Sequence, residues 1–136
     1  MLGTSLVLFM LFTICRSAPT DWIEENIDEE RHMGMAWDAA ATVINKNVRS
    51  GRFMVPKKLM EAKKRTINDS TDYEVIALFQ EGWCGPWEKN TVEEICESMC
   101  PLYHGGAEAI YKINSQAGQL SAVKVEDVIP LDAPTH

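Results

Sequence analysis

Apolar positions in residues 26–44 recur every three or four residues, which is the spacing of one buried helix face. The stripe consists of Met33, Trp37, Ala40, Ala41 and Ile44. Asn26 offers a side-chain acceptor just before this pattern, and Glu29 follows three residues later, as in a capping box. The sequence therefore predicts a long helix that is capped at Asn26 and packs through the stripe.

Residues 53–80 predict a hairpin. Residues 53–65 contain good helix formers, but Pro56 argues against a helix running through them, so we predict a strand. In residues 73–80 both alternating sets of positions include apolar side chains, which is typical of a strand buried on both faces. Residues 68–72 are polar turn formers between the two strands.

Two further strands are predicted at residues 107–114 and 120–129, joined by a turn at Ala117-Gly118-Gln119. The intervening residues 91–99 are compatible with a helix or an irregular excursion. One helix and about four antiparallel strands indicate a single domain of the α+β class.

The chain begins with features of a secretory signal peptide. Residues 6–14 are apolar but too few to span a membrane, and small residues at Cys15 and Ser17 suit cleavage before Ala18. We therefore expect a signal peptide at residues 1–17, a domain at residues 18–130 and a loose tail at residues 131–136. The mature protein should be secreted and extracellular, without a membrane-spanning segment.

Charge narrows the range of partners. Loss of Arg16 with the signal peptide changes the formal net charge from −7 to −8, which argues against nucleic-acid binding. Seven of the remaining positive charges nevertheless fall within residues 49–65. We favour a solvated strand face for this stretch, with a docking patch for an acidic partner as the alternative.

Three cysteines remain after cleavage, which in an exported protein indicates one disulfide and one further thiol. Cys96 and Cys100 are four residues apart, a spacing at which disulfide geometry is rarely met in a helix. Pairing of Cys84 with Cys100 is therefore favoured. Cys96 is then buried, paired between chains, or free.

The order of these features resembles the cystatin family, most closely the secreted cystatins of the nematode type. The residues that carry the resemblance are Ala36-Trp37, Ile44-Asn45, Pro56, Ala62, Tyr73, Cys84, Cys100, Gly105-Gly106 and Ala109-Ile110-Tyr111. The resemblance implies a cystatin-like fold, with one long helix packed on a four- to five-stranded antiparallel sheet. It also implies an inhibitor of papain-like cysteine proteases that occludes the active-site cleft, with no catalytic residues, cofactor or metal of its own.

Cystatins insert three segments into that cleft, and each differs here. The N-terminal segment lacks the family's glycine, and no Pro-Trp pair occurs near Gln119. In the family the first loop carries a QVVAG-type motif. The corresponding positions here are Arg65, Thr66, Ile67, Asn68 and Asp69. These differences predict weakened inhibition, and the alternative is a non-inhibitory binding protein with the cystatin fold.

The sequence Asn68-Asp69-Ser70 is an acceptor for N-glycosylation inside this first loop. We predict that a glycan at Asn68 blocks insertion into a protease cleft.

Two alternatives depend on the cysteines. Trp83-Cys84-Gly85-Pro86 resembles the active-site entrance of thioredoxin-like proteins, which would make Cys84 a reactive monothiol. Cys84, Cys96, Cys100 and His104 together offer the ligand types of a zinc site, although an oxidising compartment disfavours one. The three histidines, His32, His104 and His136, are more simply interpreted as ordinary polar residues.

Overall fold

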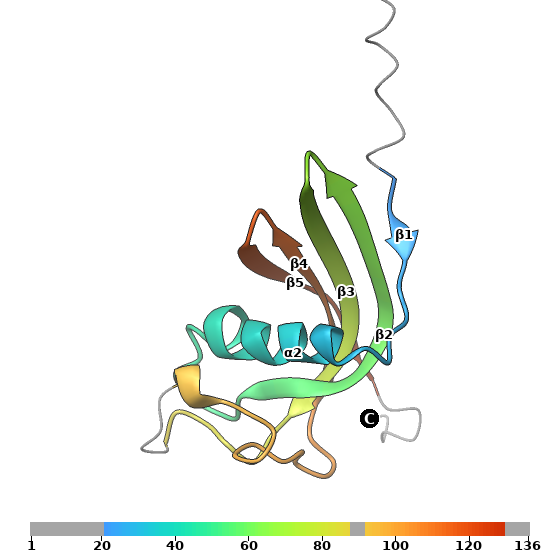
Figure 1. Cartoon of the computed structure of the whole chain (residues 1–136). Helices are drawn as coiled ribbons and strands as arrows, with labels where there is room; N and C mark the ends of the chain where they lie inside the picture. Colours follow the sequence, from blue (N-terminus) through green and yellow to red (C-terminus); the bar gives the residue numbers. More distant parts are fainter. Residues whose placement is uncertain (1–20, 88–91, 130–136) are drawn as a thin grey trace, which may run out of the picture.

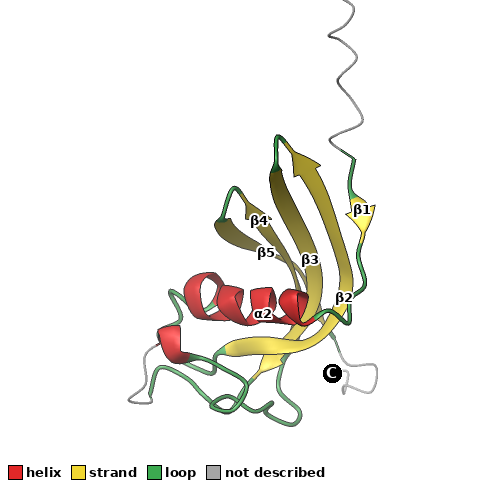
Figure 2. Ribbon diagram, viewed as in Figure 1, coloured by secondary structure: helices red, strands yellow, loops and turns green. Residues whose placement is uncertain are grey.

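The computed structural model describes residues 21–87 and 92–129, and the expected signal peptide (1–17) and tail (131–136) lie outside these ranges. The strands are β1 (Ile23–Glu24), β2 (Met54–Ile67), β3 (Ser70–Glu81), β4 (Glu108–Gln116) and β5 (Gln119–Val128). They form one antiparallel sheet in the order β1-β2-β3-β4-β5. Helix α2 (Glu30–Ala39), extended by the π-helical turn η3 (Ala40–Ile44), lies across one face of that sheet (Figures 1 and 2).

The helix is confirmed, but its predicted cap is wrong. The side chain of Asn26 accepts a hydrogen bond from the backbone amide of Asp28 at 2.9 Å, which forms a turn before the helix rather than its cap. Glu29 occupies the N-cap position, without a side-chain cap. Ala36, Ala39 and Ala40 are completely buried, so small side chains let the helix lie close to the sheet. Among the described residues, no helix has the length and apolar character needed to cross a membrane.

Strand β2 is bent by two irregularities in its pairing with β3. Register shifts occur between Pro56 and Lys58 and between Leu59 and Glu61. Each shift adds a residue on β2 and increases the local bend, and Figure 1 shows this strand curving around α2. The bulges keep Val55, Leu59 and Ala62 on the buried face despite their uneven spacing.

The core lies between the helix and one face of the sheet. Val75, Ala77 and Phe79 of β3 and Ile113 of β4 are completely buried on this side. On the other face of β3, Ile76 and Leu78 are only half-buried. The prediction that β3 is buried on both faces is therefore only partly right, because the helix covers one face of the strand only.

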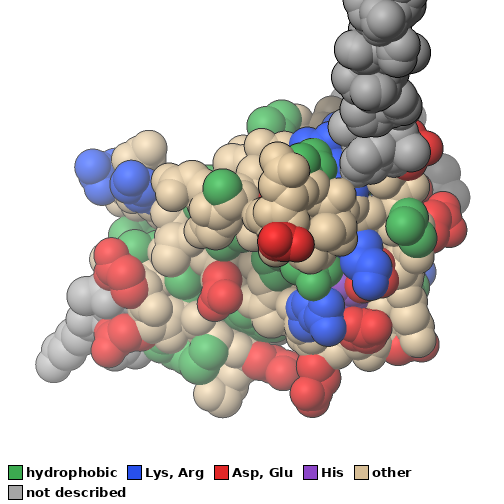
Figure 3. Space-filling view, turned by 45° about the horizontal axis from the view of Figure 1, so that its top comes forward, with side chains coloured by type: hydrophobic (Ala, Val, Ile, Leu, Met, Phe, Trp, Pro, Cys, Tyr) green, Lys and Arg blue, Asp and Glu red, His purple; other side chains and the backbone are tan. Residues whose placement is uncertain are grey.

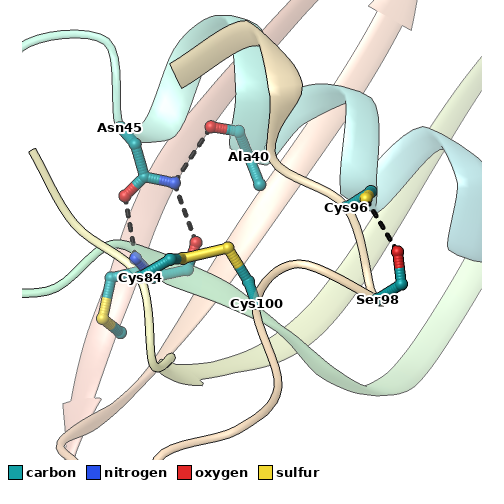
Figure 4. Close-up of a disulfide and its surroundings, with 7 residues drawn as sticks. Ala40, Asn45, Cys84, Cys96, Ser98 and Cys100 are labelled. Carbon is teal, nitrogen blue, oxygen red and sulfur yellow. Dashed lines mark hydrogen bonds between the residues drawn. A yellow bond between two sulfur atoms is a disulfide. The ribbon is translucent and has the colours of Figure 1, made fainter. Parts of the chain in front are cut away.

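Asn45 joins the end of the helix to the start of β2 (Figure 4). Its buried amide nitrogen donates hydrogen bonds to the carbonyl oxygens of Ala40 (2.9 Å) and Met54 (2.8 Å). Its Oδ1 accepts the backbone amide of Met54 at 2.8 Å. The side chain therefore satisfies backbone groups that the π-helical turn and the strand start leave open.

Cys84 and Cys100 form a disulfide, as predicted, and both are buried against the core (Figure 4). The segment that the disulfide closes contains one short 3-10 turn, η4 (Val92–Glu94), among its described residues. The helical option for residues 91–99 is thus reduced to this turn, followed by irregular chain. Cys96 is exposed and free, so the buried alternative for it is wrong.

We expect Cys96 to be the reactive thiol of the mature protein. Hydrogen bonds from the Ser98 hydroxyl, 3.3 Å from the sulfur, and from the backbone amide of Met99 lower the pKa of this thiol below its ordinary value. Ser98→Ala should raise that pKa and slow alkylation near neutral pH by roughly two- to threefold. Alkylation rates followed by intact mass test this. Equal rates for Ser98→Ala and wild type, or labelling that survives Cys96→Ser, would contradict it.

Candidate functional site

Three segments meet at one end of the molecule, at the top of Figure 1. They are the N-terminal residues leading into β1, the turn between β2 and β3, and the turn between β4 and β5. We call this end the hairpin edge, defined by Trp22, Asn68, Asp69, Ala117 and Gly118. It is assembled by register, because Ile23 pairs with Lys64 on one side of β2 and Tyr73 pairs with Ser115 on the far side of β3.

The β2–β3 turn is a tight two-residue connection. Ile67 pairs with Ser70, and Asn68 and Asp69 have φ values of 50° and 68°. Asn and Asp tolerate this left-handed region better than other residues with side chains, which explains why they form the turn. The turn is narrow and exposed, and its tip is polar.

The β4–β5 turn has the same form. Gln116 pairs with Gln119, and Ala117 and Gly118 have φ values of 52° and 79°. Gly118 adopts this conformation without strain, whereas Ala117 does so at some cost. The backbone amide of Ala117 donates to Oδ1 of Asp72 at 3.3 Å, which helps to hold the turn in place.

Arg65 and Asp72 connect all three segments. Nε of Arg65 lies 3.4 Å from Oδ2 of Asp72, while Oδ1 of the same carboxylate accepts the Ala117 amide. The Arg65 guanidinium also lies over the Trp22 ring, 4.5 Å from its centroid. Both partners of the ion pair are largely shielded from solvent, with 23% and 12% of their side-chain surfaces exposed. Arg65 and Asp72 therefore hold the three segments of the hairpin edge together.

The residues predicted for the first loop divide into two groups. Asn68 and Asp69 form the exposed tip, whereas Arg65 makes the supporting contacts described above. Thr66 places its hydroxyl 3.5 Å from that of Thr71, and Ile67 is half-buried. The supporting roles of Trp22 and Asp72 were missed, because nothing in their spacing along the sequence indicates that they meet.

The surface of this end is mostly polar. Figure 3 turns the top of the molecule toward the reader and shows hydrophobic side chains scattered among polar and backbone atoms. Four of the seven positive side chains of residues 49–65 form ion pairs within the fold. These pairs are Lys57–Glu108, Lys63–Glu61, Lys64–Glu25 and Arg65–Asp72. This pairing favours the solvated strand face over a docking patch for an acidic partner.

A second cluster lies at the other end of the sheet, around the disulfide segment. The Arg52 guanidinium lies 3.8 Å from the Tyr103 ring centroid and 4.7 Å from that of Trp83. Trp87 contributes a third ring, whose centroid lies 5.6 Å from the same guanidinium. Pro86 and Trp87 therefore lie near the disulfide, in a Pro-Trp pair that is remote from the hairpin edge.

Among solved structures, the chain is similar to the crystal structure of a salivary cystatin from the soft tick Ornithodoros moubata. The TM-score is 0.56 at 12% sequence identity, and the match covers 82% of this chain and 97% of that chain. This chain has the cystatin fold. Neither the protein-family models nor the curated proteins gave a match to its sequence.

The cystatin fold was predicted from the sequence and is confirmed, with five strands. The nematode subtype stays a prediction. The thioredoxin-like alternative is wrong, since Cys84 is bonded to Cys100 and a turn rather than a helix follows it at Pro86. The same bond removes two of the four ligands of the zinc alternative, whose fourth ligand, His104, lies in an irregular exposed segment.

Proposed function

We propose that this protein is a secreted inhibitor of cysteine endopeptidases, not an enzyme, and that its hairpin edge occupies the active-site cleft. The observation that carries this proposal is the convergence of three chain segments at one end of a cystatin fold, supported by Arg65 and Asp72. In cystatins the corresponding segments contact papain-like proteases. Two narrow turns with exposed tips have a shape that enters a cleft.

The chemistry of the tips predicts weaker inhibition than in cystatins with the QVVAG motif. Asn68 and Asp69 are polar and exposed, so desolvating them in a cleft opposes binding. Each methylene group of an apolar loop side chain that is absent here lowers the favourable free energy of binding by roughly 0.8 kcal/mol. The backbone of the two turns and the half-buried Ile67 remain available for contact.

The test is a titration of a papain-like cysteine protease with glycan-free protein. The remaining protease activity is measured from the hydrolysis of a small peptide substrate. We expect competitive inhibition with an inhibition constant of about 10 µM or below. Absence of inhibition at about 100 µM by folded protein would contradict the proposal. The non-inhibitory cystatin-fold binding protein would then be the preferred function.

We further propose that Asn68 carries an N-linked glycan when the protein passes through a eukaryotic secretory pathway. Asn68 is exposed at the tip of a turn, so its amide is accessible for modification. A glycan there would stand in front of the hairpin edge. Ser70→Ala removes the acceptor sequence and leaves the turn residues Asn68 and Asp69 unchanged. Secreted from the same host, this variant should therefore inhibit at least about tenfold more strongly than the glycosylated wild type, a difference of about 1.4 kcal/mol.

Bacterially produced wild type and Ser70→Ala form the matched control, since neither carries a glycan, and they should inhibit equally. An intact mass that shows unmodified Asn68 in secreted material would rule out this blocking mechanism while leaving the inhibitory proposal intact.

A further inference from the structure

His32 is the least expected side chain in the core. Its imidazole is completely buried, and neither Nδ1 nor Nε2 has a hydrogen-bond partner among the described residues. Buried polar groups are almost always hydrogen-bonded, and an imidazole offers either a proton or a lone pair at each nitrogen. The lone pair of an imidazole nitrogen without such a partner is available to a ligand.

Two carboxylates face Nε2 of this ring. Oε1 of Glu25 lies 3.5 Å from it and Oε1 of Glu29 lies 4.0 Å from it. One ligand atom from each of the three residues lies within 4.8 Å of the others. Ligands about 2.0–2.2 Å from one tetrahedral zinc ion are about 3.3–3.6 Å apart. The Glu25–His32 spacing already matches this geometry, and Glu29 needs only a small side-chain shift.

The backbone holds these ligands in position. Glu25 follows β1, and its amide donates to the carbonyl oxygen of Ala62 at 2.8 Å. Glu29 occupies the N-cap of α2 and accepts the His32 amide at 3.1 Å through its own carbonyl oxygen. The three ligands thus come from the end of the N-terminal strand and the first turn of the helix, which are fixed relative to each other.

Two cations already contact these carboxylates. Lys64 Nζ lies 3.2 Å from Oε2 of Glu25, so Oε1 remains directed at His32. Arg31 Nη2 lies 3.3 Å from Oε1 of Glu29, but its Nη1 also donates to the Tyr73 hydroxyl at 2.7 Å. Arg31 can therefore keep its contact with Tyr73 when Glu29 turns toward a metal.

We propose that Glu25, Glu29 and His32 form a binding site for a divalent transition-metal ion, with zinc as the best match. One imidazole nitrogen and two carboxylate oxygens are a ligand set that zinc accepts, and the 40% exposure of the Glu29 side chain leaves access for a water ligand. The bound ion would fasten the N-terminal strand to helix α2. This inference does not depend on the protein being an inhibitor.

The test uses the full secreted chain after dialysis against a chelator, titrated with Zn²⁺ alone by calorimetry near neutral pH. We expect one site with a dissociation constant of about 10 µM or below and a higher melting temperature that EDTA reverses. Glu29→Gln should weaken binding at least about tenfold. Glu30→Gln, the same change at the next and exposed helix residue, should leave binding unchanged.

A second measurement needs no variant. The ¹⁵N signals of the His32 imidazole should shift on addition of Zn²⁺, with those of His104 and His136 unchanged. No binding below about 100 µM, equal binding by Glu29→Gln and Glu30→Gln, or shifts at His104 or His136 alone would each overturn the proposal.

Discussion

Asn45→Asp should lower the free energy of unfolding by about 3–5 kcal/mol. The amide nitrogen of Asn45 donates to two carbonyl oxygens in a site where 1% of the residue is exposed. An aspartate would lose both donations and place a carboxylate oxygen against those carbonyls. Since small domains are stable by only about 5–15 kcal/mol, this change removes a large fraction of the total.

The measurement is urea unfolding followed by tryptophan fluorescence, with the midpoint and slope compared between variants. Asn47→Asp is the matched control, because Asn47 is exposed two residues away and should change stability by less than about 0.5 kcal/mol. Equal midpoints for the two variants would show that the Asn45 amide does not hold the helix end to β2.

Removal of the Cys84–Cys100 disulfide should have the second largest effect. Closure of a loop with a sequence separation of 16 stabilises by about 3 kcal/mol in the chain-entropy model. Both cysteines are also part of the buried core, so Cys84→Ala with Cys100→Ala loses packing as well. We expect a lower unfolding midpoint and faster proteolysis within the segment that the disulfide closes.

Cys96→Ser provides the control for this double variant, because Cys96 is exposed and unbonded and its replacement should leave the midpoint unchanged. A double variant as stable as wild type would show that the segment is held by packing alone, against the expectation.

The helix and the two hairpins could be predicted because their signals are local. The helical stripe, the Asn68-Asp69 turn and the Ala117-Gly118 turn each follow from a few neighbouring residues. Strand β2 was ambiguous for a physical reason that the bulges reveal. Its buried residues Val55, Leu59 and Ala62 are four and three residues apart, which imitates helical spacing.

The remaining features depend on contacts between distant residues. Tyr73 lies against His32 at 5.9 Å between ring centroids, 41 positions later in the chain, and no local pattern marked His32 as buried. The burial of His32 was therefore not anticipated, and its interpretation as an ordinary polar residue stays a prediction. The contact between Arg65 and Trp22 and that between Asp72 and Ala117 likewise arise only from strand register.

The central claim is that the hairpin edge is the protease-binding surface. The measurement that tests it most directly is the inhibition constant of glycan-free Asp69→Arg beside that of Glu93→Arg. Both variants reverse an exposed acidic charge, but Asp69 lies at the edge and Glu93 lies in η4, near the opposite end of the molecule (Figure 1). We predict inhibition at least about tenfold weaker for Asp69→Arg and unchanged within about twofold for Glu93→Arg. Equal inhibition by both variants, with matching thermal unfolding, would contradict the account.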